Sequence, residues 1–296
     1  MFYPHLSYDE PLFRPPSEGN SLIFQVTLGC SWNKCAFCEM YTSKKFSVKK
    51  EEDVFAEIDS MNLYSQNIRK VFLADGNAFV LSFSKLSRIV DRLHSVFPKL
   101  NRISAYALPK DILSKTDEEL RLLAEKGLKL LYVGIETGDD ELLQLIKKGE
   151  TFESTSEALI KARKAGIKLS VMILNGLGGR KYSKQHAVNS ARMINKVQPE
   201  YLSTLVLSFP NGVEHFKKRF TGDFKELTQL ELILEMGNFI SRLELESTIF
   251  RSDHASNYLV LKGVLKRDKD ELLQRIAKVL ENPGGSGLRP EWLRGL

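Results

Sequence analysis

Short apolar segments alternate with amphipathic segments from residue 22 to about residue 207. The apolar segments are expected to form strands at 22–27, 70–74, 102–106, 130–135, 168–174 and 201–207. Apolar residues at helical spacing predict helices at 53–61, 82–96, 141–147, 154–165 and 185–197. A further helical stretch follows Pro109, with Leu113, Leu120, Leu122 and Leu123 on its apolar face. This alternation indicates an α/β fold with a parallel sheet. Because a closed barrel needs eight such units, we expect an incomplete (β/α)6 TIM-type barrel with an open side.

The pattern changes after residue 210, which suggests a separate C-terminal part. A helix at 227–245, a strand-like piece at 248–250 and a helix at 268–280 predict a small α/β extension. We therefore expect an N-terminal extension at 1–20, the barrel core at 21–210, and a C-terminal extension at 211–296 that caps the open side. Residues 283–287 have the composition of a flexible tether, and the tail at 288–294, with one tryptophan and two arginines, is expected to dock.

Composition and charge narrow the class of protein. The 296 residues carry a formal charge of +6, which permits an anionic partner without requiring one. No run of about 18 apolar residues is present, and the first twenty residues lack the apolar stretch of a secretory signal, so a cytoplasmic protein without a membrane span is expected. The basic groups Lys44–Lys45, Lys49–Lys50 and Lys217–Arg219 are expected on solvated faces.

Cys30, Cys35 and Cys38 are the three cysteines of the chain, and all of them lie within one short loop. Such closely spaced thiols cannot staple distant parts of a fold, so a metal or redox role is indicated. Thiolates favour iron–sulfur clusters or zinc, and a structural zinc site would need a fourth protein ligand, which this loop lacks. A zinc knuckle completed by a distant histidine remains the alternative.

The cysteine loop resembles the signature of the radical S-adenosylmethionine (radical SAM) superfamily, and the core is most similar to its elongator-catalytic-subunit and coproporphyrinogen-dehydrogenase-like branch. The resemblance implies that Cys30, Cys35 and Cys38 hold a [4Fe-4S] cluster whose fourth iron is chelated by S-adenosylmethionine (SAM). It also implies that Phe37 lies beside the adenine. One departure is that four residues separate the first two cysteines, where the commonest family spacing has three.

The resemblance extends to segments at the carboxyl ends of the expected strands, where barrels of this type place their active sites. It implies a role for Asp75-Gly76-Asn77 in binding the methionyl amino group and for Glu136 in binding the ribose. Asn175 and Gly176 are similar to a segment that packs on adenine, and Lys161 or Arg163 could pair with the methionyl carboxylate. The alternatives are a simple turn at 75–77 and a helix N-terminus that favours the carboxylate of Glu136.

Two residues are candidates for the chemical step. Tyr106 ends the third expected strand and could line the cofactor pocket or donate a hydrogen atom, although buried tyrosines are also common packing residues. His254 lies in a polar loop and could line the substrate side, although such loops are more often hydrogen-bonded surface structures.

The resemblance implies an enzyme, an oxidoreductase or a transferase, that cleaves SAM reductively to form a 5′-deoxyadenosyl radical. We expect a small or lipid-like substrate and an electron donor such as flavodoxin or ferredoxin. No cysteine remains for an auxiliary cluster, which argues against methylthiotransferases and peptide-maturing members. The same chemistry on tRNA and a non-catalytic zinc- or iron–sulfur-binding module are the alternatives.

Overall fold

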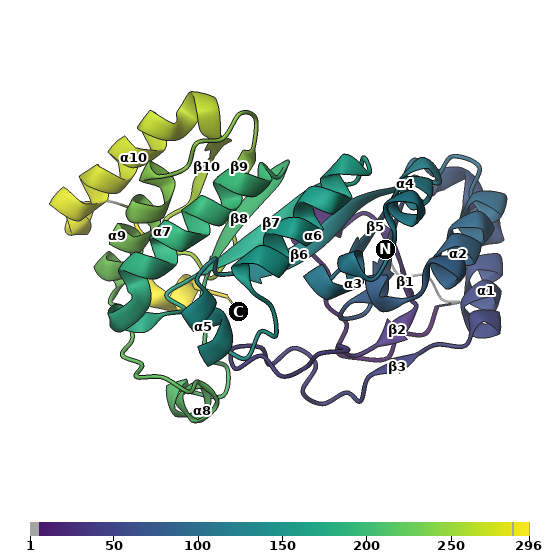
Figure 1. The fold of residues 1–296 in the computed structure, drawn as a ribbon, viewed down its shortest axis with the longest axis horizontal. Helices are drawn as coiled ribbons and strands as arrows, with labels where there is room; N and C mark the ends of the chain where they lie inside the picture. Colours follow the sequence, from purple (N-terminus) through teal and green to yellow (C-terminus); the bar gives the residue numbers. More distant parts are fainter. Residues whose placement is uncertain (1–5, 286, 296) are drawn as a thin grey trace. The chain divides into compact units, whose positions relative to one another are not determined.

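The fold is an α/β structure built on a mostly parallel sheet of eight strands. It is seen in a computed structural model that describes residues 6–285 and 287–295 (Figure 1). The strand order is β1 (Leu22–Gln25), β4 (Lys70–Ala74), β5 (Arg102–Tyr106), β6 (Leu128–Glu136), β7 (Lys168–Asn175), β8 (Tyr201–Val206), β9 (Ile249–Ser252) and β10 (Leu261–Val264). Strand β10 is antiparallel to β9, whereas β8 and β9 are parallel. The expected fold class is confirmed.

The chain forms two compact units. The first contains the N-terminal segment up to Asn33, then 38–133 and 157–169, and the second contains 34–37, 134–156 and the chain from Ser170 onward. Strands β6 and β7 continue from one unit into the other. The expected domain boundaries near residues 20 and 210 stay predictions.

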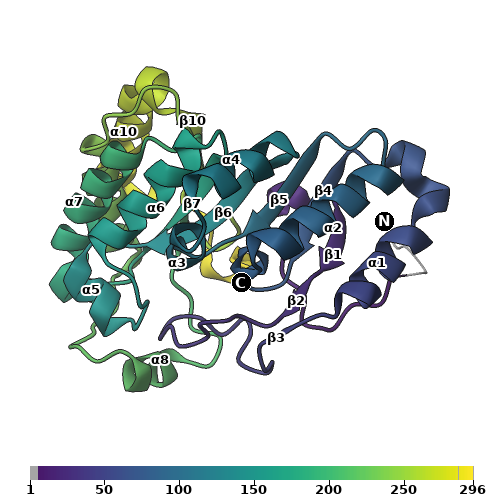
Figure 2. The ribbon, with the colours of Figure 1, turned by 45° about the vertical axis from the view of Figure 1, so that its right-hand side comes forward.

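The first unit places its helices beside β1, β4 and β5. Helices α1 and α2 lie side by side (Figure 2). The helices of this part are η1 (Pro16–Glu18), α1 (Glu51–Ser60), η2 (Asn62–Asn67), η3 (Ala78–Val80), α2 (Phe83–Val96), α3 (Pro109–Leu113), α4 (Asp117–Glu125) and α6 (Phe152–Lys164), whose first turn belongs to the second unit. The fully buried rings of Phe24 and Phe97 stack with centroids 6.2 Å apart, so β1 packs on the end of α2.

Two expected elements of this unit are each divided. The first strand ends at Gln25, and β2 (Thr27–Leu28) instead pairs antiparallel with β3 (Ser47–Val48). The helical stretch after Pro109 is interrupted between α3 and α4, because the Thr116 side chain caps α4 and accepts a hydrogen bond from the Glu119 amide.

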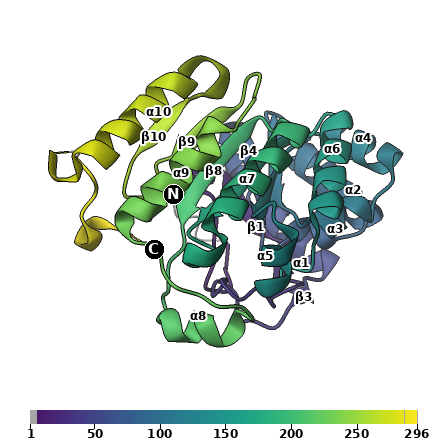
Figure 3. The same cartoon turned by 60° about the vertical axis from the view of Figure 1, so that its left-hand side comes forward.

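The second unit packs α7 (Gly179–Val197), α9 (Gln229–Ser241) and α10 (Leu265–Glu281) together beside β8 to β10 (Figure 3). Its shorter helices are α5 (Asp140–Leu145), α8 (Val213–Arg219), η4 (Pro283–Gly285) and η5 (Glu291–Leu293). Strand β10 and helix α8 were not expected, and α7 begins at Gly179 rather than near residue 185. The strand-like piece after residue 247 is confirmed as β9, which extends the parallel part of the sheet.

The C-terminal tail docks on the loop after β9, as expected. Arg289 Nη1 donates to the carbonyls of His254 and Ala255 at 2.9 and 2.8 Å, and Arg294 Nε donates to the Ser256 carbonyl at 2.8 Å. Part of the expected tether lies outside the described residues. No helix within the described ranges combines the length and the apolar composition needed to cross a membrane.

Candidate active site

The cysteine loop passes through both units, because Cys30 and Cys38 belong to the first unit and Cys35 to the second. All three thiols are half-buried and none forms a disulfide in the described part of the chain. Across residues 6–285 and 287–295, no three His, Cys, Asp or Glu side chains are gathered closely enough to hold a metal ion. The donor set fits a [4Fe-4S] cluster by its chemistry, since three thiolates are the family's ligands. Ligation by these residues stays a prediction.

Gly76 brings the end of β4 against the first cysteine. A Cβ atom at this position would lie 2.4 Å from the Gly29 carbonyl oxygen and 2.6 Å from Cys30 Cα, so only glycine permits the approach. Asn77 makes two hydrogen bonds to Ser31 in the cysteine loop. Its Oδ1 accepts from the Ser31 amide at 2.9 Å, and its Nδ2 donates to Ser31 Oγ at 2.8 Å. The segment 75–77 is therefore more than a turn, since it holds the start of the cysteine loop.

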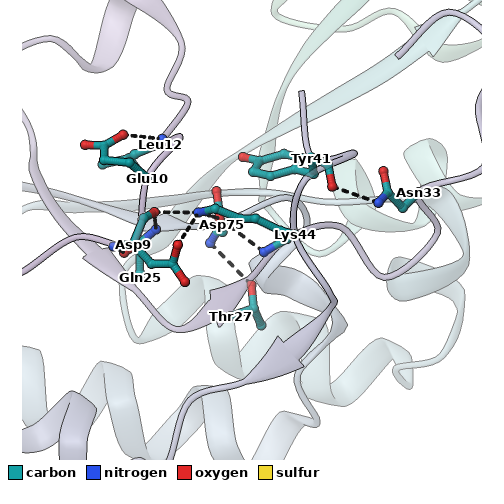
Figure 4. A network of polar contacts seen from close by, with 10 residues as sticks. Asp9, Glu10, Leu12, Gln25, Thr27, Asn33, Tyr41, Lys44 and Asp75 are labelled. Atoms are coloured by element: carbon teal, nitrogen blue, oxygen red, sulfur yellow. Dashed lines mark hydrogen bonds and ion pairs between the residues drawn. The ribbon is translucent and has the colours of Figure 1, made fainter. Parts of the chain in front are cut away.

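Asp75 is fully buried and has one oxygen to spare (Figure 4). Its Oδ2 lies 3.1 Å from Lys44 Nζ and accepts from the Gly29 amide at 3.2 Å. Its Oδ1 and the buried Tyr41 hydroxyl have no hydrogen-bond partner among the residues that the structure describes. Burial, and next the Asp75 carboxylate, raise the pKa of Tyr41. A spare carboxylate oxygen fits the positively charged amino group that the resemblance assigns to this segment.

Lys44 and Tyr41 were missed by the sequence reading. Lys44 was expected on a solvated face, but its side chain is 5% exposed. Its Nζ forms ion pairs with the carboxylates of Asp75 and Asp9. The signal that could have indicated them is their position, within six residues after Cys38 in a loop already assigned to the cofactor.

Glu136 and Lys148 form a buried ion pair in the second unit. Lys148 Nζ lies 3.1 Å from Glu136 Oε1 and 5.6 Å from the centre of the Phe37 ring. Glu136 Oε2 is buried without a hydrogen-bond partner in the described chain. Glu136 has a φ of +68°, and its side chain folds so closely over residue 134 that a Cβ at Gly134 would lie 2.0 Å from Oε1. The structure thus brings together Phe37, Glu136 and a lysine that the sequence reading did not identify.

The alternative role of Glu136 at a helix N-terminus belongs to another residue. Asp139 caps α5, because its Oδ1 accepts from the Leu142 amide at 2.9 Å. Glu136 instead keeps one free buried acceptor oxygen, as a group that binds a sugar hydroxyl would.

Lys161 and Arg163, the two cations expected to pair with the methionyl carboxylate, lie in the last turn of α6. Lys161 Nζ donates to the Lys115 carbonyl and lies 3.6 Å from the Asp117 carboxylate, at the turn between α3 and α4. Arg163 is exposed. The structure brings neither residue to the other expected cofactor residues of its unit.

The two candidates for the chemical step have local partners. Tyr106 packs against Phe72 and Tyr132 at centroid distances of 5.1 and 6.1 Å, and burial raises its pKa. His254 Nδ1 accepts from the Ser256 amide at 3.1 Å, so its ring shapes the loop after β9. Burial lowers the pKa of His254. A chemical role for either residue stays a prediction.

Asn175 and Gly176, at the end of β7, are held by α9. Asn175 Nδ2 donates to the Leu232 carbonyl at 3.2 Å, and the Gly176 amide donates to Glu235 Oε1 at 2.6 Å. Glu235 is buried, and its Oε1 lies 3.9 Å from His186 Nε2. The sequence analysis did not identify Glu235. Burial raises the pKa of Glu235 to about 7 and lowers that of His186 to about 4.

This buried carboxyl gives a testable pH dependence. Because the folded-state pKa of Glu235 exceeds its ordinary value of 4.5, the contribution of Glu235 to the free energy of unfolding falls as the pH rises from 4.5 to 7. Glu235→Gln keeps an acceptor for the Gly176 amide but cannot ionise. Its free energy of unfolding relative to the wild type should therefore rise across this window, by as much as about 3 kcal/mol. Chemical denaturation of both proteins over this pH range measures the difference, and a constant difference would contradict the assignment. His186 contributes with the opposite sign, because burial lowers its pKa.

Comparisons with known proteins identify the family of the chain. The sequence model of the Radical SAM superfamily matches residues 24–194. The chain is 23% identical over 142 residues to the heme chaperone HemW of Bacillus subtilis, covering 47% of this chain and 38% of HemW. It is 24% identical over 288 residues to tRNA-2-methylthio-N(6)-dimethylallyladenosine synthase of Hahella chejuensis, covering 92% of this chain and 61% of that protein. The chain thus spans less than two thirds of either relative.

A solved structure supports the fold. Coproporphyrinogen III oxidase (HemN) from Escherichia coli, described as a radical SAM enzyme, superposes with a TM-score of 0.57 at 16% sequence identity, over 75% of this chain and 52% of that one. The family model itself spans more than half of the 296 residues, from β1 to α7. The chain therefore belongs to the radical SAM superfamily of enzymes, whose cofactors are a [4Fe-4S] cluster and SAM.

Proposed function

We propose that this chain cleaves SAM reductively at a cluster held by Cys30, Cys35 and Cys38 and directs the resulting radical chemistry at a small or lipid-like substrate. The observation that carries the proposal is the three-cysteine loop, against whose first cysteine Gly76 packs too closely for any side chain. When bound, the cofactors supply one-electron cleavage of a carbon–sulfur bond. The polar groups of the chain then bind and orient SAM.

The buried groups with spare hydrogen-bonding capacity suggest how SAM is held. In the first unit, Asp75 Oδ1 would accept from the methionyl amino group, with the Tyr41 hydroxyl as a neighbouring donor. In the second unit, Glu136 Oε2 would accept from a ribose hydroxyl, and Lys148 would pair with the methionyl carboxylate. We assign the carboxylate to Lys148 rather than to Lys161 or Arg163, because Lys148 is buried between Glu136 and Phe37.

The number of cysteines and the burial of one basic residue both bear on the class of substrate. With all three cysteines assigned to one cluster, none remains for an auxiliary cluster, which supports a single-cluster member. The resemblance of the core favours the elongator- and coproporphyrinogen-dehydrogenase-like branch. The similarity to a tRNA-modifying enzyme favours tRNA as a second candidate substrate. Against it, Lys44, which belongs to the basic group Lys44–Lys45, is buried in an ion pair with Asp75.

Anaerobically reconstituted protein is expected to bind about four iron atoms per chain and, once reduced, to release 5′-deoxyadenosine and methionine from SAM. Metal analysis and mass spectrometry of the products measure both results. Bound zinc without 5′-deoxyadenosine would instead establish the non-catalytic module. Nucleic acid retained on purification, with affinity that falls steeply with salt, would establish tRNA as the substrate in place of a small molecule.

A further inference from the structure

Helix α8 and the part of the cysteine loop that belongs to the second unit, residues 34–37, pack against one cluster of aromatic rings. Phe209, Phe216, Phe220 and Phe224 form this phenylalanine cluster, in which the centroids of Phe216 and Phe224 are 4.7 Å apart. Ala36 belongs to the same buried core and Phe37 packs against it. Figure 1 shows α8 joined to the rest of its unit through two loops. The phenylalanine cluster therefore fixes the place of α8 beside residues 35–37.

Arg219, the last residue of α8, contacts the cysteine loop directly. Its Nη2 donates to the Cys35 carbonyl oxygen at 2.7 Å, and the Ala36 amide donates to the Ile146 carbonyl at 2.8 Å. Arg219 is half-buried, whereas the neighbouring Lys217 and Lys218 are exposed. The expectation that Lys217 to Arg219 form one solvated face is therefore wrong for Arg219. A guanidinium is always charged, so a fixed positive charge is hydrogen-bonded to the backbone carbonyl of Cys35, the middle cysteine.

We propose that Arg219 is a positioning residue for the cluster-bearing loop and that its charge raises the reduction potential of the cluster. The inference rests on the cluster assignment of the proposed function. Reduction adds negative charge to the cluster, and a nearby cation stabilises the reduced form more than the oxidised form. The charge-assisted hydrogen bond to the Cys35 carbonyl also restricts the loop before any metal binds. Arg219 lies outside residues 24–194, so the feature does not follow from the match to the family.

The test compares Arg219→Gln with Arg219→Lys, which keeps the charge, and with Lys218→Gln, which removes one exposed charge from the same helix. Midpoint potentials of the reconstituted proteins are measured by anaerobic redox titration followed by electron paramagnetic resonance, together with iron content. Arg219→Gln should have a lower potential than the wild type and retain less iron. Arg219→Lys should stay near the wild-type potential, and Lys218→Gln should match the wild type in both measurements.

Equal potentials and iron contents in Arg219→Gln and Lys218→Gln would overturn the inference. A potential that falls as far in Arg219→Lys as in Arg219→Gln would overturn the role of the charge. The thermal unfolding of the metal-free proteins separates positioning from general damage, because selective loss of iron at unchanged unfolding temperature supports positioning. If Arg219→Gln lowers the unfolding temperature and Arg219→Lys restores neither iron content nor potential, the inference is also overturned. A wild-type protein that binds no iron would instead refute the cluster assignment itself.

Discussion

Cys35→Ala is expected to reduce the release of 5′-deoxyadenosine to background and to prevent stable loading of the cluster. Removing a residue that only supports a metal ligand costs about 10- to 100-fold, so loss of a ligand itself should exceed about 100-fold. The fold should survive, because backbone hydrogen bonds of Cys35 and Ala36 also hold the loop at this point. Iron content, product release and the circular dichroism of the variant measure these three expectations.

Thr42→Ala is the matched control for this variant. Thr42 is exposed in the same connection between β2 and β3, and its hydroxyl donates to the nearby Glu39 carbonyl. The control should load iron and cleave SAM as the wild type does. Wild-type release of 5′-deoxyadenosine by Cys35→Ala would show that the cluster is held by other groups, and the proposed function would then be wrong.

Lys148→Met is expected to weaken SAM binding strongly while iron loading is retained. The variant removes the cation that we assign to the methionyl carboxylate and leaves Glu136 buried without its partner. Breaking a buried pair from one side destabilises a protein by about 3–5 kcal/mol, because the remaining charge is uncompensated. Equilibrium dialysis with SAM and chemical denaturation of the loaded protein measure the two effects.

The double variant Glu136→Gln with Lys148→Met separates binding from stability. Without a charge at either position, most of the lost stability should return, whereas SAM affinity should stay low. Lys161→Gln is the control, since Lys161 lies on α6 and its Nζ contacts the turn between α3 and α4. If Lys161→Gln lowers the affinity for SAM and Lys148→Met does not, the carboxylate belongs to Lys161, one of the two residues expected from the sequence.

The core of the fold could be predicted because its signals are local. Each of the six expected strands has a counterpart in the sheet, and the apolar run at 130–135 lies within β6. Strand β10 was missed, because Leu261–Val264 is short and contains Gly263, so its pairing with β9 decides its conformation. The start of α7 was missed because Gly176, Gly178 and Gly179 favour a loop, yet helical packing begins at Gly179.

The site could be predicted only where spacing along the chain carries the chemistry. Three thiols within nine residues indicate a metal centre whatever the surrounding fold. Glu235 lies 59 residues after Gly176, and no local sequence pattern predicts that its side chain accepts a hydrogen bond from the Gly176 amide. Side-chain direction and burial separate Lys148 from Lys161, and both depend on contacts between distant segments.

The amino-acid sequence by itself determined the barrel-type α/β core and the thiol set, because periodicity and ligand spacing are properties of neighbouring residues. Only the tertiary structure decided which charged groups contact the expected cofactor residues. It selected Lys44 beside Asp75, Lys148 beside Glu136 and Arg219 beside Cys35. The physical reason is that the environment of a charge is set by whatever the fold packs around it, and that information is distributed over the whole chain.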